Sequence, residues 1–242
     1  MNWKKIFVKL IFTRTGRFIA LFIYALKQPP NIFRYRPGNK NDIDSLNNNY
    51  IWLSNITEVN DKFEGLNEIK YDKVKLNYEF LKTGLKNIVD NIIDGVRKKF
   101  YVACFTETET NERMWEEYAD NGSGFCIEYY FYDFKTFIFP VIYNESKLVD
   151  IDKYDVNEMR RSLITKYTKW SEENEWRILW PYDEDEEKGK KISQPRPKAI
   201  YMGENIKKDL VSFLMEYCQN NYVGLYQMKK DDVGRIISTV VI

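Results

Sequence analysis

The sequence predicts an α+β fold with a mixed or antiparallel central sheet flanked by helices, preceded by a basic amphipathic N-terminal helix. Short apolar runs rich in β-branched and aromatic residues outnumber the segments with helical periodicity. The two kinds of segment do not alternate regularly, which disfavours a doubly wound parallel sheet. An apolar content of 44% with 16% aromatic residues excludes a chain that is disordered throughout.

Residues 1–30 are predicted to form a basic helical arm, and residues 31–242 a single α+β domain. The first 40 residues contain nine lysines or arginines and no acid, although the net charge of the whole chain is only +1. Apolar residues recur at helical spacing from Trp3 to Leu26, with cations on the other faces. The longest uncharged apolar run, residues 18–26, is far shorter than the roughly 20 residues needed to span a bilayer.

This arm is expected to pack on the body or to bind a protein partner through residues 1–28. Docking at a membrane surface is the alternative, because a basic amphipathic helix suits anionic lipids. Whether nucleic acid is a partner is left open. A secretory signal is disfavoured, since Gln28, Pro29 and Pro30 stand where small cleavage-site residues would be needed. The expected location is therefore the cytoplasm, with peripheral membrane contact as a variant.

Elements of the body follow from periodicity and turn residues. The stretch 100–131 is typical of a strand, a capped short helix, a glycine turn and a second strand, with Thr110 or Asn111 as the helix cap. Residues 183–191 predict a charged loop. Further strands are expected at 32–36, 50–53, 137–143, 175–180, 199–202, 223–227 and 235–241, and further helices at 42–46, 74–96, 156–170 and 206–217.

The chain contains no histidine, which excludes Ser-His-Asp and Cys-His triads and histidine-ligated zinc. Catalysis must therefore use Glu, Asp, Tyr, Ser, Lys or Arg, or a metal held by oxygen atoms. Cys104, Cys126 and Cys218 are widely spaced and lie among apolar residues, so they are expected to be reduced core residues of a cytosolic protein.

Several short segments, taken in order, are similar to a bacterial family known as domain of unknown function 2971 (DUF2971). They are Phe33-Arg34-Tyr35-Arg36, Ile51-Trp52-Leu53-Ser54, Asn60-Asp61-Lys62-Phe63-Glu64, Cys104-Phe105-Thr106-Glu107, Met114-Trp115 with Tyr118-Ala119, Gly124-Phe125-Cys126-Ile127, and Trp170 with Glu173-Asn174-Glu175-Trp176-Arg177. The sequence departs from the family pattern at Lys62, where proline is usual, and at Glu117, where histidine is usual. The resemblance implies a fold more than a function, because the family has no settled activity.

A second, more distant resemblance concerns the order of polar residues. Glu173 and Glu175 are two residues apart at the start of a predicted strand, so both carboxylates are expected on one face. A strand arginine (Arg34 or Arg36) and a strand serine (Ser54) precede them, an order that resembles ADP-ribosyltransferases.

This resemblance implies NAD as substrate. Glu175, with Glu173, would be catalytic by bonding a ribose hydroxyl and favouring an oxocarbenium-like transition state. Arg34 and Arg36 would hold the phosphates, and Ser54 would shape the nicotinamide pocket. Tyr35 and Trp52 would supply aromatic surface for stacking. An effector of bacterial anti-phage defence is one setting for such an enzyme.

Structural alternatives stand beside this hypothesis. Glu175 and Arg177 could instead form a buried charge network with each other or with the strand arginines. Trp115 and Tyr118 could be core residues rather than a ligand platform. The group Asn60, Asp61 and Glu64 could be a turn and helix cap rather than a site.

Two other function classes are also open. One is a magnesium-dependent nuclease or hydrolase that uses the acids Asp61, Glu64, Glu107, Glu173 and Glu175, although no known acid-acid-Lys motif is present. The other is a non-catalytic module that binds a ligand or a partner.

Overall fold

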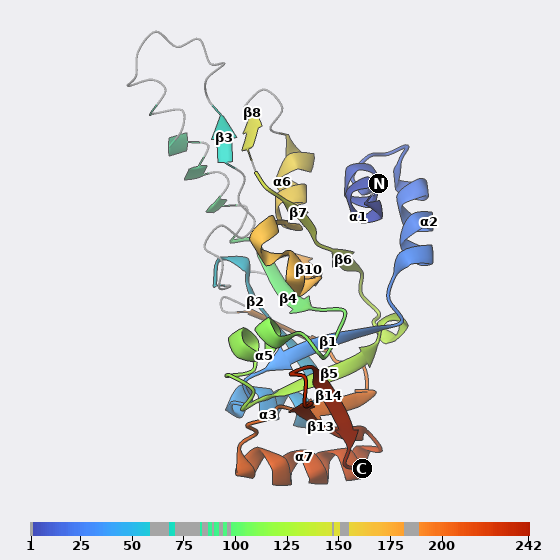
Figure 1. The fold of residues 1–242 in the computed structure, drawn as a ribbon. Helices are drawn as coiled ribbons and strands as arrows, with labels where there is room; N and C mark the ends of the chain where they lie inside the picture. Colours follow the sequence, from blue (N-terminus) through green and yellow to red (C-terminus); the bar gives the residue numbers. More distant parts are fainter. Residues whose placement is uncertain are drawn as a thin grey trace.

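The computed structural model describes residues 2–58, 98–146, 155–181 and 189–242, together with the backbone of 68–70 and 148–150 and scattered residues between 83 and 95. In this part of the chain the fold is α+β, as predicted, with helices packed around two five-stranded sheets (Figure 1). Most of the predicted helix over 74–96 and of the predicted loop over 183–191 lies outside the described residues, as do Asn60, Asp61 and Glu64. Residues 189–191 of that predicted loop belong instead to a strand, Gly189–Ser193.

The N-terminal segment forms two helices rather than the single helix predicted: α1 (Trp3–Ile11) and α2 (Arg17–Lys27). The break falls at Thr13, whose hydroxyl accepts a hydrogen bond from the Gly16 amide at 3.1 Å and so stabilises a turn. α1 buries Phe7, Val8 and Ile11 against the body. None of the helices in the described part of the chain has the length and apolar content needed to cross a bilayer.

The first sheet has the strand order β1 (Asn31–Arg36), β5 (Phe125–Tyr130), β12 (Ala199–Met202), β13 (Gly224–Lys230) and β14 (Ile236–Val240). All neighbouring strands are antiparallel except β12 and β13. Gly124 directly precedes β5 and meets the end of β1 closely, since a Cβ atom there would lie 2.1 Å from the Arg36 carbonyl oxygen. Glycine is therefore needed where these two strands approach.

The second sheet has the order β11 (Gly189–Ser193), β2 (Tyr50–Asn55), β4 (Phe100–Phe105), β10 (Trp176–Pro181) and β6 (Ile138–Pro140), and every pairing is antiparallel. The strands β4 and β5 of the predicted central unit thus lie in different sheets. The sheets are joined where Phe33 and Thr106 exchange two backbone hydrogen bonds of 2.9 Å. Side chains of both sheets form one large core.

Two small parallel pairs complete the described strands: β3 (Glu68–Lys70) with β8 (Leu148–Asp150), and β7 (Ile142–Asn144) with β9 (Thr165–Tyr167). The other helices are α3 (Lys40–Asn47), α5 (Glu112–Tyr118), α6 (Val156–Ser162) and α7 (Lys208–Asn221), and three 3₁₀ turns are η1 (Ile56–Glu58), η2 (Phe131–Asp133) and η4 (Thr168–Glu173). Asn111 caps α5 as predicted, because its side chain accepts a hydrogen bond from the Met114 amide at 3.2 Å.

The predicted helix over residues 156–170 is wrong beyond Ser162. The chain there forms β9 and then η4, and the Ile142 amide donates to the Ile164 carbonyl at 3.0 Å. Pairing with β7 therefore replaces the helical hydrogen bonds that local periodicity would allow. Because residues 165–167 form a strand rather than a helix, Lys166 lies close to the carboxylates of Glu173 and Glu175.

Candidate active site

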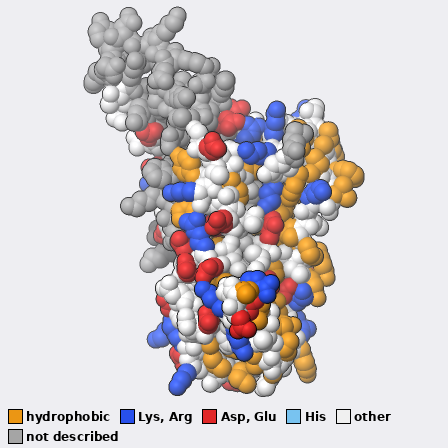
Figure 2. All heavy atoms as spheres, in the orientation of Figure 1, with side chains coloured by type: hydrophobic (Ala, Val, Ile, Leu, Met, Phe, Trp, Pro, Cys, Tyr) orange, Lys and Arg blue, Asp and Glu red, His pale blue; other side chains and the backbone are white. Residues whose placement is uncertain are grey.

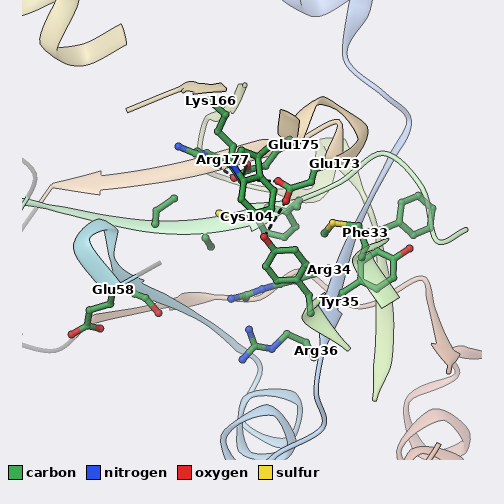
Figure 3. Close-up of a pocket in the computed structure, with 17 residues that line it drawn as sticks. Phe33, Arg34, Tyr35, Arg36, Glu58, Cys104, Lys166, Glu173, Glu175 and Arg177 are labelled. Carbon is green, nitrogen blue, oxygen red and sulfur yellow. Dashed lines mark hydrogen bonds and ion pairs between the residues drawn. The ribbon is translucent and has the colours of Figure 1, made fainter. Parts of the chain in front are cut away.

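A pocket of about 240 Å³ lies at the junction of the two sheets. β1 supplies residues 33–36, β4 supplies 102–105, and the segment from β9 to β10 supplies the charged wall. Figure 3 shows Lys166, Glu173, Glu175 and Arg177 on one side of the pocket and Arg34, Tyr35 and Arg36 on the other. Ser54 and Tyr118 also line it. Most of the residues predicted from the order Arg, Ser, Glu-x-Glu therefore meet in one hollow.

The carboxylates of Glu173 and Glu175 face the same cation. Lys166 Nζ lies 2.6 Å from Glu173 Oε2 and 3.0 Å from Glu175 Oε2. Arg177 completes the cluster, since its Nε and Nη2 donate to the two oxygens of Glu175 at 2.6 and 3.0 Å. The alternative of a buried charge network is thus present in the structure, and this network forms one wall of the pocket.

The predicted position of the two acids at the start of a strand needs correction. Glu173 is the last residue of η4, and Glu175 precedes β10. Asn174 between them has a left-handed backbone with φ 45°. This turn, rather than the alternation of a strand, directs both carboxylates to Lys166. Within β10 alternation does operate: Trp176 points into the core and Arg177 to the opposite face, toward Glu175.

The two carboxylates differ in their acidity. Burial raises the pKa of Glu173 above its usual value, and the Glu175 charge adds to this effect, although Lys166 and Tyr118 act against it. For Glu175, burial acts in the same direction but is outweighed by Arg177 and Lys166, so its pKa is strongly lowered. Glu175 is therefore ionised at neutral pH, whereas Glu173 is the carboxyl group better suited to exchange a proton.

Arg34 is the cation of the pocket without a carboxylate partner in the described part of the chain. Its Nη2 donates to the Trp52 backbone carbonyl at 2.8 Å, and its guanidinium lies 5.7 Å from the Phe105 ring centroid. Burial and the neighbouring Arg36 charge lower the pKa of Arg34 from 12.5 to about 10. Arg36, in contrast, is paired with the buried Asp42, to which its Nε donates at 2.6 Å. Arg34 is thus the guanidinium free to bind an anion.

The predicted aromatic residues take different positions. Tyr35 lines the pocket, but its hydroxyl donates to the Thr108 carbonyl at 3.0 Å and its ring packs edge-on against Trp115. Trp115 is a core residue, whose Nε1 donates to the Glu109 carbonyl at 2.7 Å. Trp52 lies in a neighbouring hollow. Tyr118 does belong to the site, because its hydroxyl donates to Glu173 Oε1 at 3.1 Å.

Cys104 departs from the prediction that all three cysteines are core residues. Cys126 and Cys218 are buried, but the Cys104 side chain is exposed in the pocket. It lies opposite Arg177 in the pairing of β4 with β10. Desolvation by the pocket walls and the Glu175 charge raise the pKa of the Cys104 thiol well above its usual range. The group is therefore a neutral thiol rather than a reactive thiolate.

Comparison with protein families supports one of the two resemblances. Residues 114–178 match the model of a family described as protein of unknown function (DUF2971). The matched range runs from α5 to β10 and carries Tyr118, Lys166, Glu173, Glu175 and Arg177. The charged wall of the pocket thus lies within the range that matches this family model. Comparisons with curated proteins and with solved structures gave no match.

Two residues of the matched range, Lys166 and Trp170, line the pocket but were not among the predicted site residues. Lys166 was placed in a helix, although the β-branched pair Ile164 and Thr165 before it could have indicated a strand. Trp170 lines the pocket, and its buried Nε1 has no hydrogen-bond partner in the described part of the chain. The Arg113 guanidinium lies 4.2 Å from the Trp170 ring centroid. This indole N–H is a donor that a bound ligand could satisfy.

Of the acids proposed for magnesium, Glu173 and Glu175 share the pocket, but Glu107 does not line it. Glu107 faces a separate hollow near the N-terminus, where it accepts hydrogen bonds from Lys4 Nζ and Trp176 Nε1, each at 2.8 Å. Among the described residues, no three His, Cys, Asp or Glu side chains are placed to hold a metal ion. Asp61 and Glu64 lie outside the described residues, as stated above.

Proposed function

We propose that the chain is an NAD-consuming enzyme of the ADP-ribosyltransferase type, with its reacting centre in the pocket between Arg34 and Glu173. The observation that carries the proposal is that the desolvated Arg34 guanidinium, which has no carboxylate partner among the described residues, faces the same pocket as a pair of carboxylates. The guanidinium suits the pyrophosphate of a dinucleotide, and carboxylates suit a sugar centre that becomes positive in the transition state.

In the proposed reaction the bond between the nicotinamide nitrogen and ribose C1′ breaks, and its electron pair leaves with the neutral nicotinamide. A new bond forms between C1′ and the oxygen of water or of an acceptor hydroxyl, whose proton is released. Glu175, held ionised by Arg177 and Lys166, stabilises the positive charge that develops at C1′. Glu173, with its raised pKa, accepts the proton, and Tyr118 orients it.

Further features support a bound substrate. The partnerless Trp170 Nε1 and the Ser54 side chain line the same pocket and offer groups for the nicotinamide amide. The three cysteines form no disulfide bond, as is usual for proteins of the reducing cytoplasm, and NAD is present in that compartment. Consumption of a cofactor that is needed throughout metabolism would suit an effector of bacterial anti-phage defence.

The test is release of nicotinamide from NAD by the purified full chain, with water, proteins or nucleic acid as acceptors. We expect Glu173→Gln and Arg34→Met each to reduce turnover by about 100-fold or more. Glu172→Gln is the matched control, because this neighbouring acid is exposed and does not line the pocket. Absence of nicotinamide release by the unmodified chain with every acceptor would refute the proposal.

A non-catalytic ligand-binding module is the second candidate. It is favoured by the ion pairs of Glu175, whose carboxylate is held by Lys166 and Arg177 and is buried. This candidate predicts that NAD or a related nucleotide binds at Arg34 without being cleaved. Calorimetric binding together with the absence of nicotinamide release would therefore favour the module over the enzyme.

A further inference from the structure

A second hollow of about 470 Å³ adjoins the first. The two hollows share Arg34, Arg36 and Ser54 as lining residues. The volume of the second falls within the range of roughly 300–1,000 Å³ that is typical of small-molecule sites, whereas the volume of the first is below it. The first pocket alone is thus too small for a complete dinucleotide, and Arg34 lies at the boundary between two compartments.

Two buried side chains of the second hollow lack hydrogen-bond partners. Tyr129 is 0% exposed and Gln194 is 8% exposed, and neither the Tyr129 hydroxyl nor Gln194 Nε2 has a hydrogen-bond partner among the described residues. Buried polar groups are nearly always satisfied in native proteins. These two groups are therefore placed to bond a ligand that is absent from the structure.

The cations of this hollow favour an anionic ligand. Lys191 Nζ lies 4.1 Å from the Tyr50 ring centroid and has no carboxylate partner among the described residues. Asp44 is the one acid among the described lining residues, and its carboxylate accepts hydrogen bonds from neutral donors, Asn48 Nδ2 at 2.8 Å and the Tyr50 hydroxyl at 2.7 Å, rather than from a cation. Arg34 and Lys191 thus bring two cations to the hollow, and neither forms an ion pair with a described carboxylate.

We infer that the second hollow is a nucleoside monophosphate site and, resting on the function proposed above, that it holds the adenosine phosphate half of NAD. Arg34 would bind the pyrophosphate at the boundary. Tyr129 and Gln194 would bond the ribose hydroxyls and the base edge, while Tyr50 and Trp52 offer aromatic surface. The nicotinamide half belongs in the first pocket, because its positive charge is favoured by Glu173 and Glu175.

The test is calorimetric binding of AMP and of nicotinamide mononucleotide to the full chain. We expect Gln194→Leu and Tyr129→Phe each to weaken AMP binding by roughly 5- to 10-fold, the effect of one buried hydrogen bond, while nicotinamide mononucleotide binding is unchanged. Asn47→Ala in α3 is the control, because Asn47 is exposed and does not line the hollow. Near-ultraviolet circular dichroism checks that the variants keep their packing.

The outcomes separate this inference from the enzymatic proposal. AMP binding that depends on Gln194 and Tyr129, without NAD turnover, would leave the site assignment standing and remove the catalytic function. NAD turnover with AMP binding that both variants leave unaltered would overturn the site assignment alone. Failure of the unmodified chain to bind AMP would also overturn it.

A different observation concerns α2, which turns an apolar face to solvent. Phe18 is 81% exposed, and Phe22 and Leu26 are each 66% exposed. Figure 2 shows hydrophobic side chains gathered on the side of the molecule where α2 lies. An apolar patch of this kind on a monomer commonly marks an interaction site.

The charge around this face identifies the partner. Exposed cations flank it in α1, in the turn and in α2, and the first acid in the sequence is Asp42. They are Lys5, Lys9, Arg14, Arg17 and Lys27. We infer that α2 docks in the interface of an anionic membrane, with its phenylalanines among the acyl chains and the cations at the lipid headgroups.

Sedimentation with phosphatidylglycerol vesicles tests this docking, with phosphatidylcholine vesicles for comparison. We expect binding to the anionic vesicles only, weakened by salt, and a more than tenfold loss in the double variant Phe18→Ser, Phe22→Ser. Val233→Ser is the control, because Val233 is 73% exposed in the turn between β13 and β14. Equal binding by the double variant, or no binding by the unmodified chain, would overturn the inference. So would a dimer in vesicle-free solution that the double variant abolishes.

Discussion

Lys166 Nζ lies 2.6 Å from Oε2 of Glu173, and both side chains are almost fully buried. A buried carboxylate and a buried ammonium are each costly alone, so each depends on the other and on the neighbouring groups. The pocket wall is therefore a cooperative unit, and changes to it should affect stability as well as chemistry.

Replacing Lys166 by methionine should destabilise the protein by about 3–5 kcal/mol, because two buried carboxylates lose a shared cation. Urea unfolding measures the effect. Lys169→Met is the matched control, since Lys169 is exposed and should change stability by no more than about 0.5 kcal/mol. Equal stability of the two variants would contradict the buried network.

The pH dependence of stability should carry a contribution from Glu173. Burial and Glu175 raise its folded pKa above 4.5, so the native state retains a proton that the unfolded state releases. The contribution of Glu173 to the free energy of unfolding is therefore fully present below pH 4.5, and it declines as the pH rises through the pKa of Glu173 in the folded state. Glu175 acts in the opposite sense, because its lowered pKa makes its contribution decline as the pH falls below 4.5.

Urea unfolding of the unmodified chain and of Glu173→Gln, compared across this range, isolates the Glu173 contribution. The stability advantage of the unmodified chain over the variant should shrink as the pH rises from 4.5. An advantage that grows with pH would show that the pKa of Glu173 is lowered rather than raised.

Gly124→Ala should destabilise the junction of β1 and β5. The new Cβ would lie 2.1 Å from the Arg36 carbonyl oxygen, so the strands must separate, at a cost of about 1–3 kcal/mol or more. Thermal unfolding measures the loss. In Gly95→Ala the new methyl group meets no atom within 4 Å, so this variant should unfold at the same temperature as the unmodified chain or slightly above it.

Asp42→Asn should weaken the start of α3 and release Arg36. The buried Asp42 carboxylate accepts hydrogen bonds from Arg36 Nε at 2.6 Å, from the Gly38 amide at 2.9 Å and from the Asn39 amide at 3.0 Å. We expect a loss of about 1.5–3 kcal/mol in the free energy of unfolding. The exposed Asp44→Asn should cost less, and the reverse order would contradict the assigned role of Asp42.

The parts of the fold that depend on neighbours in sequence were predictable. The alternating apolar residues of β1 and β2, the apolar runs of β4 and β10, and the Asn111 cap follow from local rules. The separation of β4 and β5 into two sheets depends on long-range pairing, as does the end of α6 at Ser162. No local pattern contains that information.

The same distinction applies to the site. The order Arg34, Ser54, Glu173, Glu175 led to residues that do line one pocket. The sequence did not show which of the two arginines lacks a carboxylate partner. Arg36 forms an ion pair with Asp42 of α3, and the periodicity that predicted this helix does not reveal the contact. It also did not show Lys166, whose position follows from the pairing of β9 with β7.

The Trp3 ring lies 6.0 Å from that of Trp176, the residue beside Arg177 in β10. The first turn of α1 thus packs against β10, the strand that directly follows the two glutamates of the pocket wall. Truncating the chain at its N-terminus, or fusing a tag there, will disturb the contact between Trp3 and Trp176. Activity or binding measured on such a protein would then report a pocket whose packing has changed. A tag fused after Ile242, which is exposed, leaves the contact between Trp3 and Trp176 intact.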